Sequence, residues 1–103
     1  MHVILRFFLK TKVLASTVKA KQLYEYINES VNNNENITLD FSGISGATLN
    51  FFTIIFNNIN YNKNSVKFTI TNIPISVRDQ ISFLIKNHKE IGELFEKNTF
   101  VFA

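Results

Sequence analysis

The chain has 103 residues, 11 basic and 8 acidic side chains, a formal net charge of +3 and no cysteine. This length predicts a single domain over residues 1–103 that can fold without covalent cross-links. The lack of cysteine excludes disulfides, thiolate zinc sites and cysteine nucleophiles, and it favours a cytoplasmic protein.

The basic residues are too sparse to indicate a nucleic-acid-binding protein. Lys10, Lys12, Lys19 and Lys21 form their only local concentration, which we interpret as a solvated surface. The apolar stretch from Met1 to Leu9 is too short for a membrane span and lacks a signal-peptide cleavage site. We therefore expect neither nucleic acid nor membrane as a partner. The abundance of Asn, Lys, Ile and Phe points to the AT-rich genome of a bacterium.

The first half of the chain predicts a strand, a helix and a second strand. Apolar residues alternate over Met1–Leu9, which indicates a strand with one buried face. Ser16 or Thr17 can cap a helix that extends to about Val31. The second strand is expected at Asn36–Phe41, after an asparagine-rich turn.

The second half repeats this alternation. We expect a helix from about Thr48 to Ile59, a strand at Val66–Thr71 and a helix capped by Ser76. Proline in the sequence Asn72-Ile73-Pro74 is expected to end the strand. The apolar residues Thr99–Ala103 are expected to dock as a short strand.

Strands that alternate with helices predict an α/β fold with a small sheet of three to five mainly parallel strands. A sheet covered by helices on both faces has continuously apolar strands, whereas these strands alternate. The helices should therefore pack mostly on one face of the sheet. The other face should be at least partly in water and should carry Arg6, Thr38, Asp40, Lys67, Thr69 and Thr71.

The segment Ile37–Phe56 is the most informative part of the chain, because a strand leads through a loop rich in glycine and serine into a very apolar helix. The apolar positions of that helix exceed a single core-facing stripe. Phe51 and Ile54 therefore have two open interpretations, packing in the core or contact with a partner. Thr48 is the expected N-cap of the helix.

The order of several short motifs resembles the STAS-like family of small bacterial proteins, which is related to anti-sigma-factor antagonists. The residues that carry this resemblance are Leu14-Ala15-Ser16, Asp40, Phe41, Gly43, Ile44, Thr48, Asn50, Phe51, Ile70, Asn72, Val77, Ile81 and Ile85. The resemblance implies a small sheet with helices against one face. It also implies a regulatory protein that binds a histidine-kinase-type ATPase or another kinase-like partner.

In anti-sigma-factor antagonists, phosphorylation of a serine at the junction of the loop and the helix acts as the switch. Leu49 stands at that place here. Ser42, Ser45 and Thr48 remain candidates for phosphorylation, since a helix N-terminus favours added negative charge. Their alternative role is capping and turn formation, which we prefer.

We therefore expect a non-catalytic protein-interaction module without a cofactor or a metal site. The expected partner-binding residues are Ser42, Gly43, Ser45, Gly46, Thr48, Asn50, Phe51 and Ile54. No metal-ligand spacing links His2 and His88. Asp40 has no evident nucleophile, second acid or histidine partner, so we interpret it as a solvated or capping carboxylate.

Two other classes of function stay open. One is a self-associating protein, a homodimer formed through Ile4 and Phe8 or through Phe100 and Phe102. The other, less favoured, is a small-ligand or nucleotide-binding domain that uses the helix N-terminus at Thr48, near the glycines of the loop.

Overall fold

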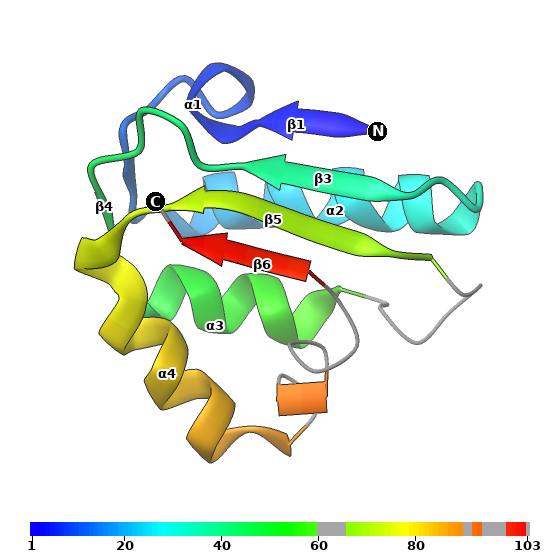
Figure 1. Ribbon diagram of the computed structural model, residues 1–103. Helices are drawn as coiled ribbons and strands as arrows, with labels where there is room; N and C mark the ends of the chain where they lie inside the picture. Colours follow the sequence, from blue (N-terminus) through cyan, green and yellow to red (C-terminus); the bar gives the residue numbers. More distant parts are fainter. Residues whose placement is uncertain (60–65, 90–91, 94–98, 103) are drawn as a thin grey trace.

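The computed structural model describes residues 1–59, 66–89, 92–93 and 99–102. Its parallel four-stranded sheet has the order β1-β3-β5-β6 (Figure 1). The strands are β1 (His2–Ile4), β3 (Ile37–Asp40), β5 (Phe68–Ile73) and β6 (Thr99–Phe102). The predicted α/β fold with a small parallel sheet is confirmed.

The order of the strands explains why the helices gather on one face. Each connection moves to the next neighbouring strand in the same direction across the sheet. Because such crossovers are right-handed, they place their helices on the same side. These helices are α2 (Thr17–Asn32), α3 (Leu49–Asn58) and α4 (Arg78–Asn87), and α3 packs against both of the others (Figure 1).

The strands alternate between the helix-covered face and the open face. Val3, Leu39 and Ile70 are buried, whereas Ile4, Thr38 and Thr69 are exposed or half-buried. Phe52 of α3 stacks on Phe41, which follows β3, and its ring also stacks on that of Phe56 with centroids 5.9 Å apart. This one-sided core leaves the opposite face partly open to water, as the alternation predicts.

The first expected strand is wrong beyond Ile4. A single-turn helix, α1 (Leu5–Phe8), follows β1 directly. Leu5 and Leu9 are both buried one helical turn apart, while the side chain of Phe7 is 69% exposed. The apolar positions fit both a period of two and one helical turn, and burial of the two leucines favours the helix. Arg6 therefore lies on α1 and not on a strand of the sheet.

The third expected strand has the predicted length but lies two residues further along the chain, at Phe68–Ile73 instead of Val66–Thr71. β5 continues through Asn72 to Ile73, and its pairing with β6 is irregular between Ile70 and Ile73. Ser76 does not cap a helix. Pro74 instead precedes a 3-10 turn, η1 (Ile75–Val77), which leads into α4. Proline at the start of the turn is consistent with its fixed φ, here −62°.

The other helix and strand predictions hold with small shifts of boundary. Ser16 caps α2, with its hydroxyl accepting from the Lys19 N–H at 3.2 Å. β6 forms the expected terminal strand, while Ala103 and the side chains of Phe100 and Phe102 lie outside the described residues. Within the described ranges, none of the helices combines the length and the apolar character needed to cross a bilayer.

Candidate functional site

The loop between β3 and α3 lies at the carboxyl end of the parallel strands (Figure 1). Part of it forms β4 (Gly46–Ala47), which pairs in parallel with β2 (Val13–Leu14). This two-stranded sheet was not expected from the sequence. The N–H of Ser45 donates to the carbonyl of Lys12 at 2.8 Å, and the N–H of Thr48 donates to the carbonyl of Leu14 at 2.9 Å. The loop backbone is thus fixed at both ends of β4.

Asp40 anchors the start of the loop. Its Oδ1 accepts from the Ser42 hydroxyl at 2.6 Å, from the Ser42 N–H at 2.8 Å and from the Asn72 amide at 3.0 Å. The Ser42 hydroxyl and then the Asn72 amide are the main causes that lower the pKa of Asp40 below its ordinary value. A carboxylate held in its ionised form by donors is a stable hydrogen-bond acceptor and a weak proton acceptor.

Asn72 joins this anchor from the neighbouring strand β5. Its side-chain amide also donates to the Ser42 hydroxyl at 2.9 Å, so it bridges both residues of the β3 end. Its backbone is left-handed, with φ of 57°, a conformation that asparagine tolerates better than most residues. From the sequence, Asn72 was expected only as part of a strand break and as one of the residues that carry the family resemblance. Its position two residues before a proline, near the end of an alternating strand, was the available signal.

Gly43 sits at the turn of the loop with φ of 78°. A Cβ atom at this position would lie 2.8 Å from Cδ of Arg6, so the Arg6 side chain packs directly against the glycine. Glycine is favoured here by its backbone conformation, and the Arg6 side chain occupies the space that a Cβ would fill. The contact connects the loop with α1.

The hydroxyl groups of the loop all have partners within the domain. Ser42 binds Asp40, and the Ser45 hydroxyl donates to the carbonyl of Lys12 at 3.2 Å. Thr48 caps α3, with its hydroxyl accepting from the N–H of Phe51 at 3.1 Å. These bonds match the preferred role in capping and turn formation. Phosphorylation of Ser45 or Thr48 stays a prediction.

The structure divides the expected partner-binding residues by exposure. Phe51 is only 2% exposed and meets Phe52 edge to face, so its interpretation as an exposed partner contact is wrong. Because α3 lies between α2 and α4, it buries more than one stripe of side chains. The exposed members are Ser42, Gly43, Ser45, Thr48 and Asn50, and Gly46 and Ile54 are half-buried.

His2 is a titratable residue that contacts Asp40. The ring nitrogen Nε2 of His2 lies 3.4 Å from Oδ2 of Asp40, and the His2 side chain is mostly exposed. Both His2 and Ser42 contact the same carboxylate, so the expectation that Asp40 has no histidine partner is wrong. Across the ranges that the structure describes, no group of three or more His, Cys, Asp or Glu side chains gathers to hold a metal.

Comparison with protein families identifies the class of this domain. The family described as "STAS-like domain of unknown function (DUF4325)" matches residues 19–80. This segment is more than half of the chain and runs from the first turn of α2 to the first turn of α4, so it includes the whole loop. The chain belongs to this family of STAS-like domains, in agreement with the resemblance drawn from its motifs. Searches of curated proteins and of solved structures gave no significant match.

Proposed function

We propose that the chain is a non-catalytic regulatory module that binds a protein partner through residues 42–48 and the exposed start of α3. The carrying observation is the combination of exposure and fixation in this loop. Four of its expected contact residues are exposed, as is Asn50 at the start of α3, while backbone hydrogen bonds to residues 12 and 14 hold the loop in place. A preordered loop loses little conformational entropy on binding, which favours recognition.

The chemistry of the loop supports recognition of a protein surface. Serine, glycine and asparagine offer hydrogen bonds without bulk, and Ile54 adds a half-buried apolar contact beside Asn50. Interfaces commonly combine such polar groups with an apolar centre. Phe51 contributes to this surface indirectly, because its buried ring fixes the position of the first turn of α3.

The identity of the partner in this proposal comes from family resemblance. Anti-sigma-factor antagonists bind kinase-like ATPases, so the partner proposed here is a histidine-kinase-type ATPase of a bacterial cytoplasm. Leu49 occupies the place of the phosphorylated serine in those proteins, so any switch in this chain requires another hydroxyl. Thr48 and Ser45 are the candidates.

A steric block at Gly46 tests the proposal. A Cβ at Gly46 would meet nothing within 4 Å, so Gly46→Gln adds a side chain to open space without disturbing the fold. Ser82→Gln adds similar bulk to an exposed site on α4 and serves as the matched control. In a pulldown from the native host, we expect Gly46→Gln to lose an ATPase that the wild type and Ser82→Gln recover. Equal recovery by all three proteins would contradict the proposed surface.

A further inference from the structure

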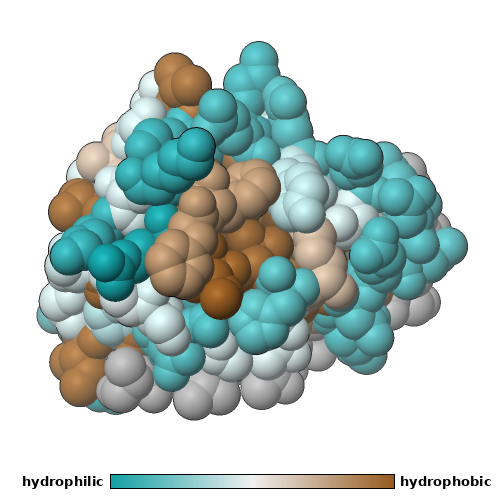
Figure 2. All heavy atoms as spheres, turned by 90° about the horizontal axis from the view of Figure 1, so that it is seen from above, coloured by the Kyte–Doolittle hydropathy of each residue, from teal (hydrophilic) through white to brown (hydrophobic). Residues whose placement is uncertain are grey.

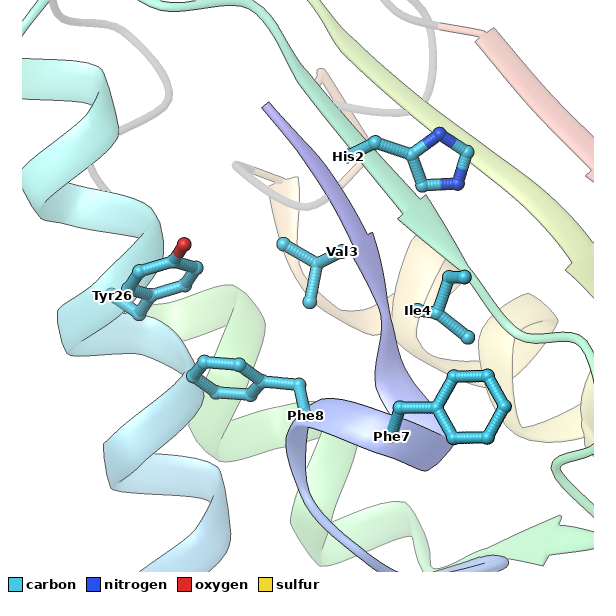
Figure 3. Close-up of a pocket in the computed structure, with 6 residues that line it drawn as sticks. All are labelled: His2, Val3, Ile4, Phe7, Phe8 and Tyr26. Atoms are coloured by element: carbon cyan, nitrogen blue, oxygen red, sulfur yellow. The ribbon is translucent and has the colours of Figure 1, made fainter.

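Helix α1 creates two adjoining hollows beside the edge strand β1. The first has a volume of about 210 Å³ and is lined by His2, Val3, Ile4, Phe7, Phe8 and Tyr26 (Figure 3). The second has a volume of about 320 Å³ and is lined by Arg6, Phe7, Lys10, Thr11 and Lys12. Phe7 lines both, so the two hollows share one exposed aromatic ring.

The first hollow is mainly apolar. The rings of Phe8 and Tyr26 stack with centroids 4.7 Å apart and form one wall, while Val3 and Ile4 come from β1 (Figure 3). Ile4 is 36% exposed, although most large apolar side chains on β1, β3 and β5 are buried. Figure 2 shows an apolar patch, bordered by hydrophilic residues, on the side of the molecule where α1 and β1 lie. Exposed apolar patches with polar rims mark interaction sites.

The second hollow is basic. None of its lining residues is acidic, and the ion pairs His2–Asp40 and Lys21–Glu25 of the described part of the chain involve none of its cations. The Arg6 guanidinium carbon lies 5.9 Å from the centre of the Phe7 ring. The positive charges of Arg6, Lys10 and Lys12 are therefore not compensated by a carboxylate of the described residues.

We propose that this two-part surface binds an acidic peptide segment of a protein partner that carries an apolar side chain. The apolar side chain would enter the hollow between Phe7 and Tyr26, and the acidic groups would lie against Arg6, Lys10 and Lys12. Charge complementarity selects this occupant over a neutral or basic one. The inference rests on the proposed partner-binding function and deepens it, because Arg6 packs on Gly43 and joins this surface to the loop.

Titration of the 15N-labelled protein with a short synthetic peptide, glutamates around one leucine, tests this assignment. We expect its amide resonances to shift at residues 6–12, and the affinity to fall as salt is added. Two control peptides separate the contributions. Replacing the glutamates by glutamines should abolish binding, and replacing the leucine by glycine should weaken it.

Variants of the protein test the same contacts. Lys10 has φ of 54°, so Lys10→Asn removes its charge while keeping a residue that tolerates this backbone. We expect the double variant Lys10→Asn with Lys12→Gln to bind the acidic peptide roughly tenfold more weakly. Lys67→Gln removes an exposed charge that lines neither hollow and should leave the affinity unchanged. Phe7→Gln should weaken binding of the leucine peptide and leave the glycine peptide unaffected.

Several outcomes would overturn the inference. One is equal binding of the glutamate and glutamine peptides, and another is unchanged affinity of the double variant. A third is inorganic pyrophosphate binding at residues 6–12 with no contribution from leucine, which would indicate a small-anion site. A fourth is a dimer in light scattering that Phe7→Gln dissociates, which would assign the surface to a second copy. If Gly46→Gln loses the partner and any of these results is also observed, the proposed function of the loop is supported and only the inference about the hollows is rejected.

Discussion

The side-chain amide of Asn72 lies 3.0 Å from the carboxylate of Asp40 and thereby ties the end of β5 to the end of β3. This contact also fixes Ser42, the first residue of the proposed partner-binding loop (residues 42–48), because both groups form hydrogen bonds with its hydroxyl. The two strands are already paired through their backbones. The side-chain contact extends that pairing to the loop.

Replacement of Asn72 should separate the contribution of its side chain from that of its backbone. Asn72→Gly keeps the left-handed conformation but removes both hydrogen bonds of the side-chain amide. We therefore expect the free energy of unfolding to fall by about 1 kcal/mol. Asn72→Ala should cost about 1 kcal/mol more, because alanine is strained at positive φ. Urea denaturation of both variants measures this difference. Equal stability of the alanine and glycine variants would contradict the backbone argument.

Asp40 should make stability depend on pH in acid. Its pKa is lowered in the folded protein, chiefly by the Ser42 hydroxyl, from an unfolded value of about 3.9. The unfolded chain therefore takes up the proton first as the pH falls. The stabilisation is complete above the unfolded pKa and is lost as the pH falls through the folded pKa.

Urea midpoints of the wild type and Asp40→Asn, measured between about pH 6 and pH 2, test this dependence. The wild type should lose more stability over this range than the variant, in which Asp40 no longer titrates. Parallel curves for the two proteins would show that the hydrogen bonds at Asp40 do not favour its ionised form.

Gly43 and Arg6 should be coupled. Gly43→Ala places a Cβ at 2.8 Å from Arg6 Cδ and at a φ of 78°, so we expect it to lower the free energy of unfolding by about 2 kcal/mol or more. In an Arg6→Ala background the steric part disappears and only the backbone strain remains. The cost of Gly43→Ala should therefore be smaller there, and an identical cost in both backgrounds would show that the two side chains do not compete for space.

Phe51 and Asn50 should differ sharply although they are adjacent in the sequence. Phe51→Ala removes a ring that is 2% exposed, so a loss of about 3–5 kcal/mol in the free energy of unfolding is expected. Asn50→Ala changes an exposed side chain and should stay within about 0.5 kcal/mol. Thermal or urea unfolding of both variants checks this contrast. A small effect of Phe51→Ala would place the ring outside the core.

Much of the fold follows from local patterns in the sequence. Ser16 and Thr48 begin helices α2 and α3 because hydroxyls at those positions cap free N–H groups. The alternation in β3 and β5 predicts a sheet with one covered face. The order of the strands explains why the helices all lie on that face. These features depend on neighbours in the chain and on simple periodicity, which can be read without coordinates.

Other features depend on contacts that no local pattern specifies. Residues 5–9 fit a strand and a helical turn equally, and only the burial of Leu5 and Leu9 decides between them. β2 and β4 contain two residues each, and their pairing depends on the position of the loop beside residues 12–14. Phe51 could be assigned to the core only once α4 was seen to flank α3. The hollows beside α1 could not be predicted either, because the alternating pattern places Arg6 and Phe7 on a strand.

Amide chemical-shift mapping of the 15N-labelled protein with its purified partner tests the central claim most directly. We expect the largest shifts on residues 42–50, with further shifts at residues 6–12, and we expect Gly46→Gln to abolish them. Shifts confined to α4 and the N-terminal ends of the strands, with residues 42–50 unchanged, would contradict it.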